Sequence, residues 1–311
     1  MKKLKLLFNP ECTVSCAHYY LRPVFEQYFD IVEYDPRRDY DAKEHIIFTS
    51  IINRMPWFVH LADQGARVIY DALWEHHKAQ LFPVKLLPGP GLILDCKFYF
   101  WINEHYYNIS QGYQNYVPAK NIEYRALLPI RQTKPHRKRL LDKLAPCIDS
   151  ILYSQVDQGR FLPNDITEDL GIFQRYFDSQ WYDSTAFTIV SETVTYTKYQ
   201  LHVTEKCFKP MAYYHPFVVW GQPGVLQYLQ QLGFETFPHL FDETYDQELD
   251  QDLRLNQIVK NIQDFDVTPS YDTTTLQKLQ HNRNLFYSQD RVETLFRQGI
   301  VDPIMEYAQT R

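Results

Sequence analysis

No apolar run in the 311-residue sequence approaches the roughly 20 residues that a membrane-spanning helix needs. The start, MKKLKLLFNPE, is basic and then apolar, but the apolar stretch is too short for a secretory signal peptide. The composition, with 45% hydrophobic and 23% charged residues, is that of a globular protein and excludes wholesale disorder. We therefore expect a soluble protein without a membrane span, whose length favours two domains.

An excess of positive charge is also missing, since 38 Asp and Glu outnumber 32 Lys and Arg. The net charge of −6 argues against a surface that binds nucleic acid throughout, but it is compatible with a local basic stripe. Cysteines are few, odd in number and scattered, which indicates reduced thiols in a cytoplasmic compartment. Cys12, Cys16 and His18 would be the metal candidates, but no second ligand pair at zinc spacing follows. We expect no bound metal.

Motifs of several common enzyme classes are absent. The sequence has no phosphate loop, no Gly-X-Ser-X-Gly elbow and no His-Glu-X-X-His pair, which lowers the hydrolase and metalloprotease hypotheses. Three Asp-X-Asp triplets occur, but none directly follows a predicted buried strand, where a metal-dependent transferase would carry one. Aromatic residues are abundant at 16%, which suits either a stacking surface, a wet cleft or a tyrosine-rich core.

Short apolar runs alternate with amphipathic stretches along nearly the whole chain. This alternation is typical of α/β proteins with mainly parallel sheets. We expect two Rossmann-like halves with a cleft between them, divided into residues 1–115, residues 116–270 and a group of C-terminal helices, 271–311, that packs back on the fold. Strands are predicted at 4–8, 31–34, 45–50, 67–71, 84–87, 92–94, 124–130, 151–154, 186–191 and 216–220. Helices are predicted at 19–29, 56–64, 137–143, 204–214, 225–231, 249–262 and 292–307.

The segment from Arg131 to Arg139 is basic and lies where a predicted strand ends and a helix begins. Pro135 suits the first turn of that helix, where its missing N–H costs nothing. Backbone N–H groups and positive charge converge at such a helix start, which favours a phosphate or diphosphate. A solvated basic face and contact with a nucleic-acid backbone are the alternatives. The candidate binding residues are Arg131, Lys134, His136 and Arg137.

A second polar cluster follows the predicted buried strand AFTIV. Glu192 comes at its end, and Thr204 can cap the next helix with Glu205 and Lys206 in its first turn. Ligands of open α/β sheets bind at the carboxyl ends of strands. Glu can accept two ribose hydroxyls and Lys can offset a diphosphate charge, while Gly221 opens a tight turn that lets a ligand approach the backbone. An ordinary helix cap with a surface salt bridge is the alternative.

The order SET…VTEKCFKP…PFVVWGQPGVLQYLQQLGFETF, preceded by LPIRQTKPHRKRLLDKL, resembles glycosyltransferase-like proteins from phages and large viruses. It is also distantly similar to the donor domain of fucosyltransferases, which have the two-domain GT-B fold. The resemblance covers roughly residues 123–255, about 40% of the chain. It implies that residues 116–270 bind a nucleotide sugar and that residues 1–115 form the acceptor side. The segment Phe208-Lys209-Pro210 departs from the fucosyltransferase pattern, so the identity of the donor does not carry over.

The resemblance also implies roles for single residues. Glu192 corresponds to an acidic residue near the ribose or sugar, and Thr204, Glu205 and Lys206 correspond to the T-E-K turn. Phosphate contacts are implied for Arg131, Lys134 and Arg137. The implied activity is a glycosyltransferase that uses a nucleotide sugar as co-substrate, with no bound cofactor and no metal, because helix dipoles and cations stabilise the departing diphosphate.

A carboxylate or histidine of the N-terminal half would act as base on the acceptor hydroxyl, and the candidates are Asp63, Asp71, Glu75, His60 and His76. The acceptor is either a glycan or a modified pyrimidine in viral DNA, which aromatic residues of the same half could stack. A non-catalytic module that binds nucleotides or nucleic acid is the alternative to an enzyme. The expected location is the cytoplasm, of the host cell if the protein is viral.

Overall fold

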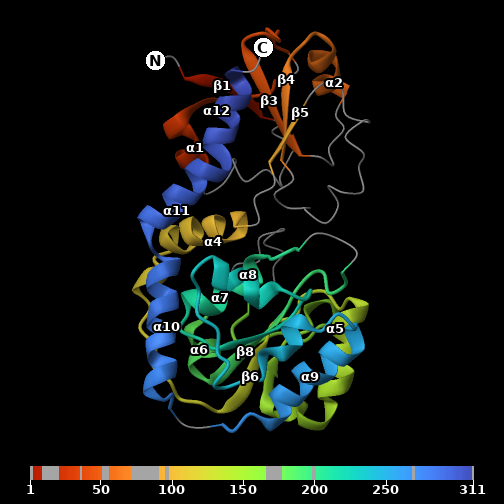
Figure 1. Ribbon diagram of the computed structural model, residues 1–311, viewed down its shortest axis with the longest axis vertical. Helices are drawn as coiled ribbons and strands as arrows, with labels where there is room; N and C mark the ends of the chain where they lie inside the picture. The colour runs from red at the N-terminus through yellow and green to blue at the C-terminus, as the bar shows by residue number, and fades with distance from the viewer. Residues whose placement is uncertain are drawn as a thin grey trace. The chain divides into compact units, whose positions relative to one another are not determined.

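The computed structural model divides into two compact units (Figure 1). Unit 1 comprises Met1–Gln111 together with Gln289–Arg311, and unit 2 comprises Gly112–Ser288. The sequence predicts boundaries at 115/116 and 270/271, whereas the chain enters unit 2 at residue 112 and leaves it after residue 288. The structure describes residues 3–8, 21–35, 37–50, 56–71, 91–94, 98–165, 177–197, 201–267 and 270–309.

Unit 1 is built on a parallel sheet with the strand order β2-β1-β3-β4-β5. Leu6, Leu7 and Phe8 in β1 are fully buried, as expected for a strand covered on both faces. The C-terminal helix α12 (Asp302–Gln309) belongs to this unit because the Arg67 guanidinium donates to carbonyl oxygens of that helix. The strands are β1 (Leu4–Phe8), β2 (Phe29–Glu33), β3 (His45–Ser50), β4 (Arg67–Asp71) and β5 (Gly91–Leu94).

Unit 2 has a second parallel sheet with the order β7-β6-β8-β9. Every residue of β8 and of β9 is buried, which explains why both strands are continuous apolar runs in the sequence. Helices follow the strands and provide the connections that parallel pairing requires. The strands are β6 (Tyr124–Leu128), β7 (Ile151–Tyr153), β8 (Thr185–Ser191) and β9 (Phe217–Trp220).

The helices of unit 1 are α1 (Arg22–Tyr28), α2 (Pro56–Asp63), α4 (Tyr99–Ser110), α11 (Gln289–Phe296) and α12. Those of unit 2 are α5 (Pro135–Leu144), α6 (Ser179–Asp183), α7 (Glu205–Ala212), α8 (Val225–Gln231), α9 (Gln251–Asp264) and α10 (Thr273–Phe286). Short 3-10 turns are η3 (Tyr113–Asn115), η4 (Ala145–Ser150), η5 (Val156–Gln158) and η6 (Glu243–Gln247), and the π-helical turn η7 (Arg297–Val301) joins α11 to α12. Within the described ranges, no helix is both long enough and apolar enough to cross a bilayer.

The predicted fold class is confirmed, since each unit is an α/β unit with an all-parallel sheet, in the Rossmann-like manner. The predicted strands 4–8, 45–50 and 67–71 coincide with β1, β3 and β4. The predicted strand 84–87 lies outside the described residues. Two helices, α4 and α6, were not predicted, and α10 was expected only as an unbounded member of the C-terminal helices at 271–311.

Candidate functional site

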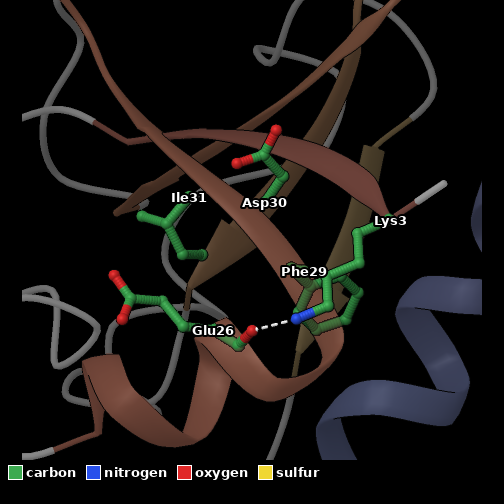
Figure 2. A pocket seen from close by; sticks show the side chains of 5 residues that line it. All are labelled: Lys3, Glu26, Phe29, Asp30 and Ile31. Carbon is green, nitrogen blue, oxygen red and sulfur yellow. Dashed lines mark hydrogen bonds between the residues drawn. The ribbon is translucent and has the colours of Figure 1, made fainter.

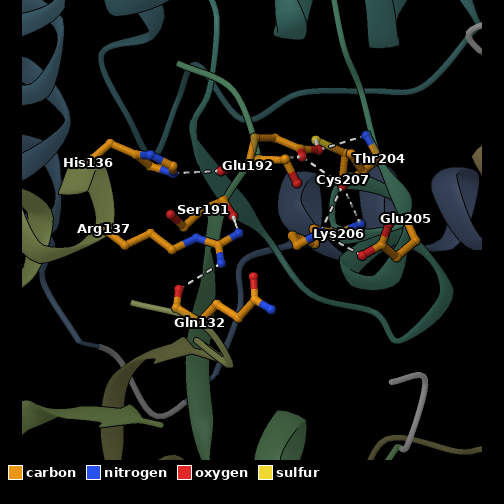
Figure 3. A network of polar contacts seen from close by, with 10 residues as sticks. Gln132, His136, Arg137, Ser191, Glu192, Thr204, Glu205, Lys206 and Cys207 are labelled. Carbon is orange, nitrogen blue, oxygen red and sulfur yellow. Dashed lines mark hydrogen bonds and ion pairs between the residues drawn. The ribbon is translucent and has the colours of Figure 1, made fainter. Parts of the chain in front are cut away.

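The two polar clusters predicted from the sequence meet at the carboxyl edge of the unit 2 sheet (Figure 3). His136, at the start of α5, lies against the end of β8, where its Nε2 is 2.9 Å from the backbone oxygen of Glu192. The guanidinium of Arg137 donates to the carbonyl of Ser191 at 3.1 Å. Trp220, at the end of β9, donates its indole N–H to the carbonyl of His136 at 3.2 Å. Elements far apart in the sequence thus share one edge, where ligands of parallel sheets bind.

Glu192 anchors the start of α7 on the end of β8. Its side chain is fully buried, and its carboxylate accepts four hydrogen bonds. Oε1 accepts from the Thr204 N–H at 2.8 Å and from the Cys207 thiol at 3.1 Å. Oε2 accepts from the Thr204 hydroxyl at 2.6 Å and from the Thr193 N–H at 3.1 Å. Because protein donors engage both oxygens, this carboxylate positions α7 rather than facing a ligand.

The first turn of α7 presents a close pair of opposite charges. Thr204 caps the helix and accepts the N–H of Lys206 at 3.4 Å. The Lys206 ammonium donates to the Thr204 hydroxyl at 3.2 Å and to the Glu205 carboxylate at 2.6 Å. Burial alone would raise the pKa of Glu205, but the ammonium groups of Lys206 and Lys209 lower that pKa to about 2. Glu205 is therefore a carboxylate at neutral pH, next to a cation at the helix start.

His136 is a neutral imidazole with a defined tautomer. A carbonyl oxygen can only accept, so Nε2 carries the proton and donates to Glu192. Burial lowers the pKa of His136 to about 4, and the nearby cations Arg137 and Lys134 act in the same direction. The Nδ1 lone pair has no partner in the described part of the chain.

The lowered pKa of His136 predicts a pH-dependent loss of stability. The unfolded chain takes up this proton at its ordinary pKa near 6.5, whereas the folded chain does so only near 4. Between these values the unfolded state binds more protons, so acidification removes up to about 3 kcal/mol of unfolding free energy. We expect this part of the pH dependence to be absent in His136→Gln, as measured by urea denaturation from pH 7 to pH 4. Parallel curves for the two proteins would contradict it.

The Arg137 side chain links the start of α5 to the end of β8, and its charge is not exposed to solvent. Its side chain is 5% exposed, and its guanidinium donates to the carbonyls of Gln132, at 3.0 Å, and Ser191. The buried Nε of Arg137 and the buried hydroxyl of Ser191 have no hydrogen-bond partner among the described residues. Two polar groups beside the α5 start thus lack an acceptor or donor, an arrangement that a ligand or ordered water would satisfy.

Two further cations of the basic segment pair with carboxylates. Lys138 pairs with Asp142 at 2.9 Å, and Arg139 pairs with Asp252 at the start of α9. Arg131 is half-buried and its Nε is unpartnered within the described ranges. These pairs disfavour the hypothesis of a basic stripe for nucleic acid, because paired cations do not present a continuous positive surface.

Two residues that the sequence analysis did not single out hold the connection between β8 and α7. The Arg254 guanidinium donates to the carbonyl of Thr195 and, at 2.6 Å, to that of Glu248. Gln222 accepts the His202 N–H at 2.7 Å and donates to the Tyr196 carbonyl at 3.0 Å. The sequence did carry one signal. Arg254 falls four residues before Ile258 on the apolar stripe of α9, where a buried charge needs partners.

Gly221 serves packing at this edge. A Cβ on this residue would lie 3.3 Å from side-chain atoms of Val219 and Val225 and 3.4 Å from the Glu192 Cγ. The sequence predicts that a ligand approaches the backbone here, and the structure places the side chains of Val219, Val225 and Glu192 next to this position.

The three carboxylates proposed as base belong to unit 1 and fall at different places. Asp63 is exposed at the end of α2, a few residues before β4 begins, and so lies at the amino edge of the sheet. Asp71 is the last residue of β4, at the carboxyl edge, where a ligand is expected. Glu75 and His76 lie outside the described residues. By its position in the sheet, Asp71 is therefore better placed than Asp63.

Within the described part of the chain, cavities also lie away from the predicted site residues. One, of about 370 Å³, lies beside Lys3 and Phe29 at the amino ends of β1 and β2, where the Lys3 ammonium donates to the Glu26 carbonyl (Figure 2). The other, of about 570 Å³, is lined by Tyr271, whose hydroxyl donates to the Ala186 carbonyl near the start of β8. Both lie at amino ends of strands, the edge opposite to the usual ligand edge.

The metal candidates Cys12, Cys16 and His18 lie outside the described residues. Among the residues that are described, no three His, Cys, Asp or Glu side chains form a group able to hold a metal ion. One Asp-X-Asp triplet has a structural use, since Asp250 caps α9 and Asp252 pairs with Arg139.

By its fold, the chain is an α/β protein with two Rossmann-like halves. No protein-family model matches the sequence. No curated protein matches it either. A solved structure of an alpha1,3-fucosyltransferase is similar to this chain with a TM-score of 0.47 and 12% sequence identity, over 93% of this chain and 90% of that one.

Proposed function

We propose that the protein is a glycosyltransferase that moves a sugar from a nucleotide-sugar donor to an acceptor hydroxyl, and that unit 2 binds the donor. The observation that carries this proposal is the start of α7. There a buried carboxylate, Glu192, fixes a capped helix start at the carboxyl edge of the sheet, with Lys206 and Glu205 in its first turn. The cation and the helix dipole can bind a diphosphate, and the carboxylate can accept hydrogen bonds from ribose hydroxyls.

Each side chain of the edge receives a role in this proposal. The Lys206 ammonium and the Arg131 guanidinium offset the charge of the diphosphate, and the α7 dipole adds to their effect. Glu205, ionised at neutral pH, accepts hydrogen bonds from ribose hydroxyls. Glu192 and Arg137 position the two helix starts. Because cations and the start of α7 carry the phosphates, the proposed reaction needs no metal.

The chemical step is a displacement at the anomeric carbon of the donor sugar. The bond from that carbon to the diphosphate oxygen breaks, and a bond to the acceptor oxygen forms. The electron pair of the broken bond leaves with the nucleoside diphosphate, whose negative charge Lys206 stabilises. The acceptor proton passes to a base of unit 1, for which Asp71 and Glu75 are the candidates. The acceptor is a glycan or a modified pyrimidine in DNA.

The test is thermal unfolding with UDP, GDP, ADP, CMP and their sugars, each with and without Mg²⁺ or Mn²⁺. A ligand at 100 times its dissociation constant stabilises a protein by about 2.7 kcal/mol, which gives a clear melting shift. We expect one nucleotide family to stabilise the protein without metal, and its sugar derivative to release nucleotide when an acceptor is supplied. Binding without release would favour the non-catalytic nucleotide-binding module, and no shift with any nucleotide would contradict the proposal.

A further inference from the structure

The start of α5 offers a hydrogen-bond acceptor as well as donors. The neutral His136 uses Nε2–H on the Glu192 carbonyl, which leaves the Nδ1 lone pair available. His136 is the second residue of α5, where a backbone N–H has no acceptor within the helix, and Lys134 gives no side-chain cap. One residue therefore presents a lone pair and an N–H donor at the ligand edge.

A second polar group lies beside it. Ser191, the last residue of β8, is 4% exposed, and its hydroxyl has no partner among the residues that the structure describes. Arg137 donates to the Ser191 carbonyl at 3.1 Å and His136 to the carbonyl of the next residue, Glu192, at 2.9 Å, so both side chains contact the end of β8 (Figure 3). A buried hydroxyl without a partner costs free energy, and a ligand group that bonds to it removes that cost.

The chemistry of these groups selects among the parts of a sugar nucleotide. An ionised phosphate oxygen only accepts hydrogen bonds, so it repels the Nδ1 lone pair. A hydroxyl fits, because it donates to Nδ1 while accepting from the backbone N–H or from Ser191. The neighbouring cation Arg137 does not change this preference for a hydroxyl, because its guanidinium donates to backbone carbonyls.

We propose that His136 and Ser191 recognise a hydroxyl group of the donor, on its ribose or on the sugar that is transferred, and that the phosphates bind instead toward Lys206 and Arg131. This inference rests on the proposed function and adds to it two residues that recognise a hydroxyl group of the donor. It also replaces the expectation that the start of α5 is itself the phosphate site.

Two variants of His136 separate its structural bond from its ligand bond. In His136→Gln, the side-chain amide can still donate to the Glu192 carbonyl, but the Nδ1 acceptor is lost. In His136→Asn, an amide oxygen takes the position of Nδ1, while the bond to Glu192 is lost. We expect His136→Gln to melt within about 2 °C of the wild type and to bind the sugar nucleotide about 10-fold more weakly, the loss of one hydrogen bond. We expect His136→Asn to melt lower and to retain more of the affinity.

Ser191→Ala is an independent variant with an opposite expected effect on stability. Removing a buried hydroxyl that has no partner leaves the melting temperature of the free protein unchanged or higher. Affinity for the sugar nucleotide should nevertheless fall about 10-fold. A lower melting temperature with unchanged affinity would show a purely structural hydroxyl and overturn its assignment.

Calorimetric titration of each variant uses three probes: inorganic pyrophosphate, the free nucleoside diphosphate of the family that stabilises the wild type, and its sugar derivative. We expect pyrophosphate affinity to stay unchanged. A ribose hydroxyl is identified if both nucleotides bind more weakly, and a hydroxyl of the transferred sugar if only the sugar derivative does. Weaker pyrophosphate binding, or unchanged binding of both nucleotides, overturns this inference while the proposed function stands. A wild type that binds no nucleotide overturns both.

Discussion

Replacing Glu192 by Leu is expected to lower the unfolding free energy of unit 2 by about 3–5 kcal/mol, the range for removing one partner of a buried charged network. The substitution leaves the N–H groups of Thr193 and Thr204, the Thr204 hydroxyl and the Cys207 thiol without their acceptor. The start of α7 would lose its attachment to β8. Urea denaturation, followed through tryptophan fluorescence, measures the loss.

Glu192→Gln and Glu205→Gln are the matched controls for this prediction. The first keeps one acceptor oxygen but turns an amide N–H₂ toward donors, so an intermediate loss is expected. The second neutralises the next carboxylate along α7, which is a quarter exposed and accepts from the Lys206 ammonium, and should cost less than Glu192→Leu. If Glu192→Leu unfolded within 1 kcal/mol of the wild type, the anchoring role of Glu192 would be wrong.

Replacing Lys206 by Ala is expected to lower the rate of sugar transfer by about 100- to 1000-fold, the usual effect of removing one group that stabilises charge in the transition state. Stability should fall by less than in Glu192→Leu, because the Lys206–Glu205 pair is partly exposed. Turnover is measured as nucleotide release from the sugar nucleotide in the presence of acceptor.

Two further variants test whether activity depends on a cation at the start of α7 or only on the net charge of the protein. Lys206→Arg keeps a cation at the helix start and should retain more activity than Lys206→Ala. Lys138→Ala removes an exposed cation of α5 that pairs with Asp142, and should leave turnover unchanged. Near-wild-type turnover in Lys206→Ala would remove the assignment of this residue to the diphosphate.

The fold was largely predictable because parallel strands buried on both faces are short, continuous apolar runs in the sequence. The run TAFTIVS of β8 and the run FVVW of β9 are buried throughout, and both were recognised. Amphipathic helices with apolar stripes, such as α9, were recognised for the same reason. In these elements, local pattern and tertiary burial agree.

The helices without predicted bounds do not show a separate apolar and polar face in the sequence. In α4 most positions are buried, including Asn103, Glu104 and His105, so the sequence shows no polar face. In α10 the buried positions include Asn282 and Arg283. These polar residues interrupt the apolar periodicity that would predict a helix. The Arg283 guanidinium is buried because it donates to three backbone carbonyls, of Ala212, Gln114 and Tyr116. Partners supplied by distant segments cannot be inferred from one stretch of sequence.

The location of the candidate site could be predicted from the sequence, but the role of each side chain in it could not. The sequence placed polar residues after β8 and at the starts of α5 and α7, which the structure brings to one edge. It could not show that Glu192 is saturated by protein donors, or that Arg137 is held by carbonyls. Residue type indicates what a side chain can bind, whereas three-dimensional neighbours decide what it does bind.

The central claim is that the edge formed by β8, α5 and α7 binds the nucleotide part of a sugar nucleotide. Hydrogen–deuterium exchange with and without the stabilising nucleotide tests this claim most directly. We predict slower exchange in peptides that cover the α7 start, at Thr204–Cys207, and the α5 start, at Thr133–Arg137. Protection confined to other parts of the chain, with these two helix starts unchanged, would contradict the account.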